Sequence, residues 1–242
     1  MDEEWLLSHN LYRSCCKAPY FEWDESLARK AQDWADWLKT NFEGQPRHPK
    51  TSSEENKFLS YDGKDYDKSP LGQNIAWYWA RNRTNEGSPS NSVASWYAEG
   101  EFYNPEKPSL SCDGCSPESG DELGHFTQLC WKDSSKVGCG VSETIDGDEN
   151  SSVWVCNYSP AGNMLTAGNK YAQFKTNVGT WDEDCGSGLV VEEGKPVLPP
   201  SPSVSPTTTN WGRMPLIVFI IVILGIVGSA IYFFFRSLRT DQ

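Results

Sequence analysis

The sequence predicts an α+β domain followed by a polar stalk and one membrane-spanning helix, and three patterns carry this prediction. Helical and strand-like segments follow in the order helix, helix, strand, helix and then consecutive strands, which favours a sandwich of helices flanking a mixed sheet. A Pro/Ser/Thr-rich stretch follows at 196–209, and an uncharged apolar run occupies 216–235. We expect a domain at 1–180, a stalk at 181–214, a span at 215–235 and a basic tail at 236–242.

Two helices are predicted near the N-terminus. Residues 3–17 carry apolar side chains at helical spacing, and Pro19 ends this segment. Asp24 is suited to cap a second helix, whose apolar stripe follows an i, i+4, i+7, i+11 pattern. The stripe consists of Leu27, Ala31, Trp34 and Leu38. His9 lies in the first helix, and we interpret it as a polar residue that hydrogen-bonds locally.

The central part of the chain alternates between polar and apolar segments. Residues 41–69 are polar and contain His48 close to two prolines, so extended chain or a turn is expected there rather than a helix face. A strand-like apolar run follows at 70–79. A third helix is predicted at 92–103, where Glu99 follows a tryptophan by three positions and therefore lies near the same face.

Consecutive strands are predicted after residue 124. Phe126–Trp131 has the β-branched and aromatic content of a strand, and Asp133–Ser135 is typical of a turn. Lys136–Val141 would return as the second arm of this hairpin, which places His125 at its start. The alternating pattern at 152–160 predicts a further strand.

The apolar run indicates a membrane span. A helix over 216–235 would rise about 30 Å, which matches the hydrocarbon thickness of a bilayer. Arg213 precedes the run, and Arg236 and Arg239 follow it, a bias that favours a cytoplasmic C-terminus. The N-terminus is acidic and lacks the apolar region of a signal peptide. Either a signal is missing from this sequence, or the span itself targets a tail-anchored protein whose domain faces the cytosol.

The eight cysteines favour the first topology, with disulfides in an extracellular or lumenal domain and a short cytoplasmic tail. Adjacent Cys15 and Cys16 would each bond elsewhere, or one would stay free, because a bond between neighbours is strained. Asn82 and Asn150 are candidate glycosylation sites, whereas Asn157 in its apolar strand is expected to be a buried structural residue. The net charge of −12 excludes a nucleic-acid partner.

Four separated stretches carry longer motifs: Gly124–Trp131 with Val137–Cys139, Val155–Asn163, Leu71–Ala76 and Trp96–Glu99. Together they resemble one family, the CAP superfamily of cysteine-rich secretory proteins, antigen 5 and pathogenesis-related proteins. The branches most similar to this chain are the Golgi-associated plant pathogenesis-related and the membrane-anchored glioma pathogenesis-related proteins. The resemblance covers roughly residues 5–178 and implies a three-layer α-β-α sandwich.

The resemblance also implies a cleft that gathers His48, Gln73, Glu99 and His125. His48 is assigned by its place upstream of the Gly-Gln-Asn segment, whereas Glu99 and His125 match motifs directly. Two imidazoles are suitable zinc ligands, so His48 and His125 are the candidate metal ligands. Gln73 departs from the family pattern, which has glutamate there. An amide has no titratable carboxylate and cannot act as a base.

Three functions are compatible with these features. The first is a membrane-tethered module that binds a lipid or sterol, with the many aromatic residues either lining apolar grooves or packing the core. The second is a metal-dependent hydrolase or protease, which Gln73 disfavours. The third is an adhesion or signalling ectodomain that binds a protein through its acidic surface. We expect the first or third, without catalytic residues, and a homodimer is a further candidate assembly.

Overall fold

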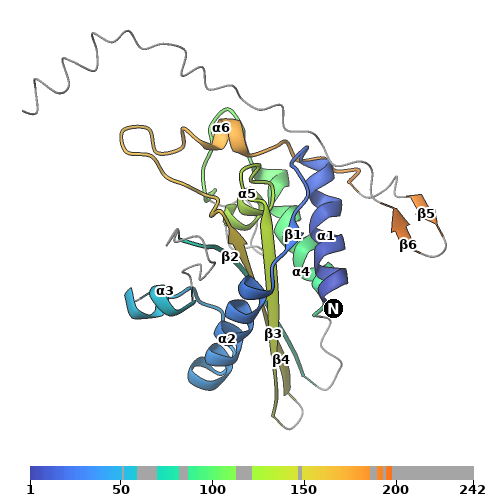
Figure 1. Cartoon of the computed structure of the whole chain (residues 1–242), viewed down its shortest axis with the longest axis vertical. Helices are drawn as coiled ribbons and strands as arrows, with labels where there is room; N and C mark the ends of the chain where they lie inside the picture. The colour runs from blue at the N-terminus through green and yellow to red at the C-terminus, as the bar shows by residue number, and fades with distance from the viewer. Residues whose placement is uncertain are drawn as a thin grey trace, which may run out of the picture. The chain divides into compact units, whose positions relative to one another are not determined.

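A computed structural model provides the structure of the chain (Figure 1). It describes residues 1–50, 52–58, 70–81, 87–112, 122–146, 149–185, 190–192 and 195–197. The predicted span, the tail, most of the stalk and Asn82 lie outside these residues. Within the described ranges, no helix combines the length and the apolar character that crossing a membrane requires.

Four strands form one mixed sheet in the order β1-β3-β4-β2, in which β1 is parallel to β3 and the other neighbours are antiparallel. The predicted mixed sheet is therefore confirmed. The strands of this sheet are β1 (Glu22–Trp23), β2 (Gly72–Arg81), β3 (Lys136–Asp146) and β4 (Glu149–Ser159), while β5 (Val190–Glu192) and β6 (Lys195–Val197) pair separately. The helices are α1 (Asp2–Cys15), α2 (Glu25–Phe42), α3 (Ser52–Phe58), α4 (Pro89–Ala98), the 3-10 helix η1 (Glu99–Phe102), α5 (Gly124–Leu129) and α6 (Phe174–Asn177).

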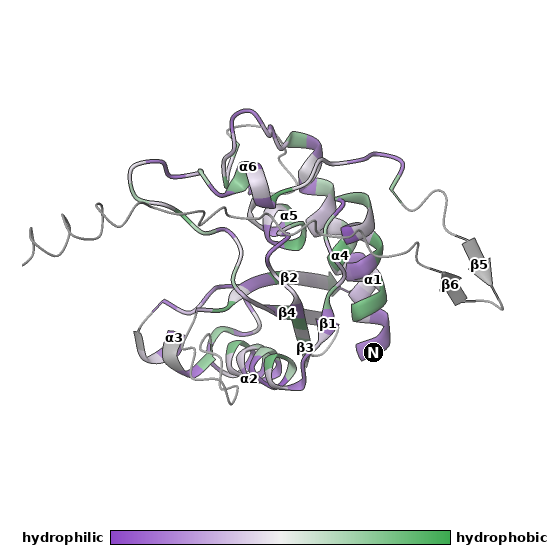
Figure 2. Cartoon of the chain, turned by 45° about the horizontal axis from the view of Figure 1, so that its top comes forward, coloured by the Kyte–Doolittle hydropathy of each residue, from purple (hydrophilic) through white to green (hydrophobic). Residues whose placement is uncertain are grey.

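α2 covers one face of the sheet, as its apolar stripe predicts (Figure 2). The Asp24 carboxylate caps the helix by accepting the backbone N–H groups of Ser26 and Leu27, at 2.9 and 3.2 Å. The four stripe residues are completely buried, and most of them pack against side chains of β2 and β4. The predicted second helix, its cap and its buried face are all confirmed.

Two glycines allow α2 to lie directly against β3. A Cβ atom added at Gly138 would come within 2.2 Å of the backbone nitrogen of Ala28, and one at Gly140 within 2.5 Å of Gln32. Glycine is therefore required at both positions by the close approach of the helix backbone. The side chain of Gln32 also bonds the backbone of Val141, donating at 2.7 Å and accepting at 3.0 Å.

α1, α4 and α5 cover the opposite face, which completes the predicted three-layer sandwich (Figure 2). The core on this side is aromatic. Trp5 of α1 stacks on Trp96 of α4, with ring centroids 6.2 Å apart, and lies 5.7 Å from the ring of Trp154 on β4. Both Trp5 and Trp96 are almost completely buried, so these rings pack the core rather than line a groove.

Arg13 links the end of α1 to the chain that follows α5. Its guanidinium is completely buried and donates to the carbonyl oxygens of Leu129, Trp131 and Ser134 at 2.9, 2.9 and 2.8 Å. A further bond reaches the carbonyl of Pro19. Burial lowers the pKa of Arg13 to about 9, and the converging carbonyl dipoles stabilise the charge that remains. The C-terminal end of α5 is thereby fixed against α1.

Two sequence predictions need correction. Residues 126–131 do not form a strand, because 124–129 is the helix α5. The third helix begins at Pro89 instead of residue 92 and changes to the 3-10 helix η1 from Glu99. The extended chain expected around His48 is confirmed, and it is followed by α3, whose only apolar residue, Phe58, packs on the second helix. Neither short helix carries the repeated apolar spacing that identifies longer helices, so both depend on tertiary contacts.

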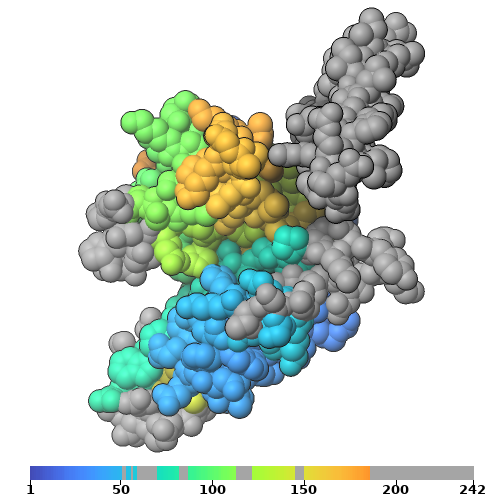
Figure 3. All heavy atoms as spheres, turned by 90° about the vertical axis from the view of Figure 1, so that its left-hand side faces the viewer, coloured from blue at the N-terminus to red at the C-terminus, as the bar shows by residue number. Residues whose placement is uncertain are grey.

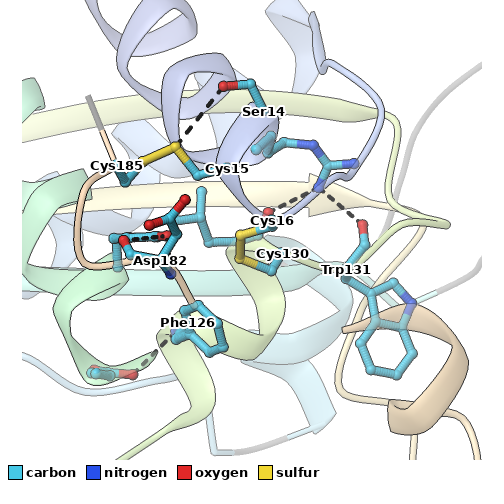
Figure 4. The surroundings of a disulfide bond; sticks show 12 residues. Ser14, Cys15, Cys16, Phe126, Cys130, Trp131, Asp182 and Cys185 are labelled. Carbon is cyan, nitrogen blue, oxygen red and sulfur yellow. Dashed lines mark hydrogen bonds between the residues drawn. A yellow bond between two sulfur atoms is a disulfide. The ribbon is translucent and has the colours of Figure 1, made fainter. Parts of the chain in front are cut away.

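Disulfides connect distant parts of the domain (Figure 4). Cys15 bonds Cys185 across a sequence separation of 170, and Cys16 bonds Cys130. The prediction that the adjacent cysteines bond elsewhere is therefore confirmed. A third bond joins Cys139 and Cys156, which face each other on β3 and β4. The first bond holds the chain after α6 beside the end of α1, where Figure 4 shows Asp182 next to Cys185.

The described asparagines of the sequons differ in their surroundings. Asn157 is completely buried, which confirms its structural interpretation. Asn150 lies in β4 opposite Ala80 of β2 and is partly exposed. Its glycosylation remains a prediction, as does that of Asn82.

His9 is buried between α1 and the sheet. Its Nδ1 atom lies 2.7 Å from the carbonyl oxygen of Trp5, the local contact that the sequence predicts. Its Nε2 atom also lies 3.0 Å from the hydroxyl of Tyr158 on β4. Burial lowers the pKa of His9 to about 4, although the bond to Trp5 opposes this shift.

We predict that acid destabilises the domain through His9. Between pH 6.5 and about 4 the unfolded chain binds a proton at this residue and the folded chain does not, so stability falls as pH falls. The loss should reach about 3 kcal/mol across this window. Urea unfolding at a series of pH values measures it. In His9→Gln, the fall in stability between pH 6.5 and about 4 should disappear. If the free energy of unfolding changes equally with pH in both proteins, His9 is not the responsible group.

Candidate functional site

The four residues of the expected cleft come from four different segments. His48 lies in the extended chain between α2 and α3, and Gln73 is the second residue of β2. Glu99 begins η1, and His125 is the second residue of α5. The structure brings them together as two hydrogen-bonded pairs. Nδ1 of His48 lies 2.9 Å from Oε1 of Gln73, and Nδ1 of His125 lies 2.5 Å from Oε1 of Glu99.

The Glu99 carboxylate is fully engaged by α5. Oε1 receives the imidazole of His125, and Oε2 accepts the backbone N–H groups of His125 and Phe126, each at 3.1 Å. These N–H groups belong to the first turn of α5, where no partner exists within the helix. Glu99 therefore caps this helix from a distant part of the sequence, and its side chain is only 5% exposed.

Local features place Glu99 against α5. Gly100 follows it, and a Cβ atom there would lie 2.5 Å from the rings of Phe126 and Trp181. Only glycine allows η1 and α5 to approach this closely. Trp96, one turn before Glu99, stacks on the ring of His125 with centroids 6.1 Å apart. The tryptophan thus supports the imidazole from one side, and the carboxylate fixes its orientation.

His125 presents its second ring nitrogen to the cleft. Because Nδ1 donates to a carboxylate, the neutral ring carries its lone pair on Nε2. No described residue gives Nε2 a hydrogen-bond partner. Burial by itself would lower the pKa of His125, but the hydrogen bond and charge of Glu99 outweigh it, with help from Glu122 at 3.9 Å. The pKa is therefore raised, and the imidazolium is stabilised.

His48 is held by a chain of amides that extends to the sheet. Asn157 faces Gln73 across the β2–β4 register, and its Oδ1 accepts from Nε2 of Gln73 at 3.0 Å. This leaves Oε1 of Gln73 to accept from His48, so His48 also keeps its lone pair on Nε2. His48 is exposed at the surface, yet the protein atoms around its ring displace enough water to lower its pKa; the nearby His125 lowers it further, while Gln73 opposes both.

In the part of the chain that the structure describes, the arrangement provides two imidazole nitrogens and no group of three potential ligands that includes either of them. Metal-ligating histidines are typically oriented through the other ring nitrogen, as both are here. Among the described residues, however, the only three-residue His/Cys/Asp/Glu group with ligand atoms within 4.8 Å is His9, Cys139 and Cys156. That group is not a metal site, because the cysteines form a disulfide and His9 bonds Tyr158. The cleft could hold zinc only with water completing the coordination.

The sequence did not reveal the residues that position the cleft. Asn157 was recognisable as buried, but its contact with Gln73 depends on the strand register. Asn74 donates to the carbonyl of His125 at 3.1 Å and fixes α5 over β2. Asn74 and Trp96 lie in the same motif stretches as Gln73 and Glu99, and this proximity in sequence is the signal that points to them.

Residues 6–158 match the family model described as the cysteine-rich secretory protein family, CAP. The chain belongs to the CAP family. The resemblance inferred from the motifs is therefore confirmed, and the matched region contains all four cleft residues.

Relatives with several names share this domain. Human cysteine-rich secretory protein LCCL domain-containing 2 is 33% identical over 67% of this chain and 30% of its own length. Human GLIPR1-like protein 1 is 32% identical over 65% of this chain and 57% of its own length. Venom allergen 5 of Brachyponera chinensis is 31% identical over 62% of this chain and 64% of its own length. The match thus spans less than two thirds of each relative.

Solved structures also resemble the chain. Venom allergen-like protein 4 of Schistosoma mansoni has a TM-score of 0.44 and 23% identity over 66% of this chain and 88% of its own. A structure of NaASP2 with Zn²⁺ has a TM-score of 0.44 and 17% identity over 77% of this chain and 88% of its own. The family assignment depends on the sequence match and not on these values.

Proposed function

We propose that this CAP protein is a membrane-anchored binding protein without catalytic activity, whose cleft holds a lipid or sterol. The observation that carries the proposal is the hydrogen bonding of the Glu99 carboxylate. Both of its oxygens hold groups of α5, so the carboxylate is not available to a substrate or to water. At the other histidine, Gln73 supplies an amide in place of a carboxylate.

Hydrolysis would require a free base near the scissile bond. A general base must reach the proton that it removes and must be able to hold it. Protonating Glu99 would weaken the cap of α5 and the bond to His125 together. Gln73 cannot take a proton at all. At His125 the hydrogen bond and charge of Glu99 outweigh burial and raise the pKa, so they stabilise the imidazolium relative to the neutral ring that a base would use.

Two arguments support a lipid ligand: the resemblance to the CAP family, and the aromatic side chains that remain exposed at the surface. Trp5, Trp34, Trp96 and Trp131 are buried core residues, so they are not available to line a ligand groove. Tyr12 of α1 and Tyr97 of α4 stack with centroids 4.5 Å apart, and Tyr12 remains partly exposed. The exposed part of the Tyr12 ring offers an apolar surface with a polar edge, which suits a sterol or an acyl chain, whereas Tyr97 beside it is buried.

A protein ligand is the second candidate. The net charge of −12 favours a basic partner, and a domain carried on a stalk would be accessible to one. The disulfides among the described residues support an extracellular or lumenal domain, because such bonds persist in oxidising compartments. Protease protection of the domain in intact cells distinguishes this topology from the tail-anchored alternative.

We predict that the purified full chain binds cholesterol or palmitate saturably with micromolar affinity and cleaves no peptide. Scintillation proximity with the radiolabelled lipid measures binding, and mass spectrometry of a peptide library incubated with Zn²⁺ measures cleavage. Lipid binding should weaken in His125→Ala, because the imidazole is one of the four residues of the cleft that is proposed to hold the lipid. Zinc-dependent, chelator-sensitive cleavage that His125→Ala abolishes would contradict the proposal. Saturable binding of a basic protein without any lipid binding would favour the second candidate.

We further propose that His48 and His125 bind zinc weakly through their Nε2 atoms. Gln73→Glu should tighten zinc binding by about tenfold, because a carboxylate on Nδ1 makes the His48 imidazole a stronger ligand. Isothermal titration calorimetry of the full chain at pH 8 measures the change. The control is the same substitution in a His48→Ala background, where no gain is expected. Equal affinity of the original chain and Gln73→Glu would contradict this assignment.

A further inference from the structure

Two tryptophans on β2 are exposed, in contrast to the buried tryptophans of the core. The side chains of Trp77 and Trp79 are 37% and 46% exposed. Residues two apart in a strand point to the same face, so the two rings lie about 7 Å apart along β2. Ile75, the preceding residue on this face, is buried under α2. The tryptophans therefore continue the α2-facing surface of the sheet beyond the point where the helix covers it.

The end of α2 leaves this surface open. Glu43 and Gly44 have φ values of +53° and +76°, which turn the chain away from the helix axis. Gly44 lies close to the sheet, since a Cβ atom there would be 3.6 Å from Oγ of Ser151. Figure 3 shows this face of the molecule, with α2 in blue and the neighbouring strands in teal and yellow.

A groove of about 310 Å³ lies between these elements. It is lined by Lys39, Glu43, Gln45, Trp77, Trp79, Thr144 and Ser151. The lining combines two aromatic rings with two hydroxyls, one amide, one cation and one anion. Within the described part of the chain, the hydroxyls of Thr144 and Ser151 and the side-chain amide of Gln45 form no hydrogen bonds. Arg81 lies 5.6 Å from the Trp79 ring centroid, a contact that restrains the ring.

We propose that this groove binds a neutral saccharide. A pyranose has an apolar C–H face that stacks on an indole ring and a rim of hydroxyls that pair with amides and hydroxyls. The opposite charges of Lys39 and Glu43 cancel, which favours an uncharged ligand over an acidic glycan or an anionic membrane. An acyl chain would leave the polar groups of the lining unpaired, at a cost for each one.

The saccharide groove is separate from the cleft. Gln73 and Trp79 are six residues apart on β2, a distance of about 20 Å along an extended strand. No lining residue of the groove belongs to the cleft or bonds one of its members. Substitutions in the groove should therefore leave lipid and zinc binding at the cleft unchanged. The saccharide proposal and the proposed function of the cleft can thus fail independently.

The test uses the purified full chain on an array of neutral oligosaccharides: chitotetraose, cellotetraose, maltotetraose and mannotetraose. At least one should bind saturably, and Trp79→Ala should weaken it by tenfold or more. Trp79→Phe should retain most of the binding because it keeps an aromatic face. Leu165→Ala is the matched control, because Leu165 is 49% exposed and lies outside the groove. Gln45→Ala should weaken binding without altering any buried side chain.

Four results would overturn the proposal. The first is that no member of the array binds. The second is that Leu165→Ala weakens binding as much as Trp79→Ala does. The third is that a heparin oligosaccharide binds more tightly than the neutral sugars, which would contradict the charge argument. The fourth is that the tryptophans are required for binding to phosphatidylcholine vesicles but not to sugars, which would make the surface a membrane contact.

Discussion

Glu99 places its carboxylate where two backbone N–H groups of α5 and the imidazole of His125 converge on it. A six-residue helix has little stability of its own, so α5 depends on this cap and on the contacts of its apolar side chains. Hydrogen bonds to a charged group contribute about 1.5–3 kcal/mol each. The same carboxylate fixes the tautomer of His125 and raises its pKa. One side chain thus determines the structure of the helix and the chemistry of the histidine.

This double role restricts what the cleft can do. A carboxylate that holds a helix and a histidine cannot also activate water without weakening both. The second histidine is held by Gln73, which is itself held by Asn157 from the neighbouring strand. Both imidazoles therefore have fixed orientations and a free Nε2, a geometry that suits binding. A site with rigid imidazole ligands and no available carboxylate is expected to recognise a molecule rather than to transform it.

Periodic patterns predicted the parts of the fold that make their own contacts. The stripe of α2 was recognisable because its apolar residues repeat at helical spacing and are completely buried. β4 was recognisable from its alternating composition, although residues 151–158 are buried on both faces of the sheet. α5 was predicted as a strand, because Phe126 and its neighbours have strand-like composition and the cap is 26 positions away. The motif resemblance identified the cleft residues, but the pairing of Gln73 with Asn157 follows from register. Contacts between residues distant in sequence leave no local signal.

The most direct test of this account is the pKa of His125, measured by NMR titration of the histidine ring protons in the original chain and in Glu99→Gln. The chain has only three histidines, so their signals can be assigned by single substitutions. Glu122→Gln is the control, because that carboxylate is exposed and lies farther away, at 3.9 Å. The account predicts a pKa above 6.5 in the original chain, a value below 6.5 in Glu99→Gln and a small decrease in the control. A pKa of His125 that is unchanged by Glu99→Gln would contradict the claim that this carboxylate organises the site.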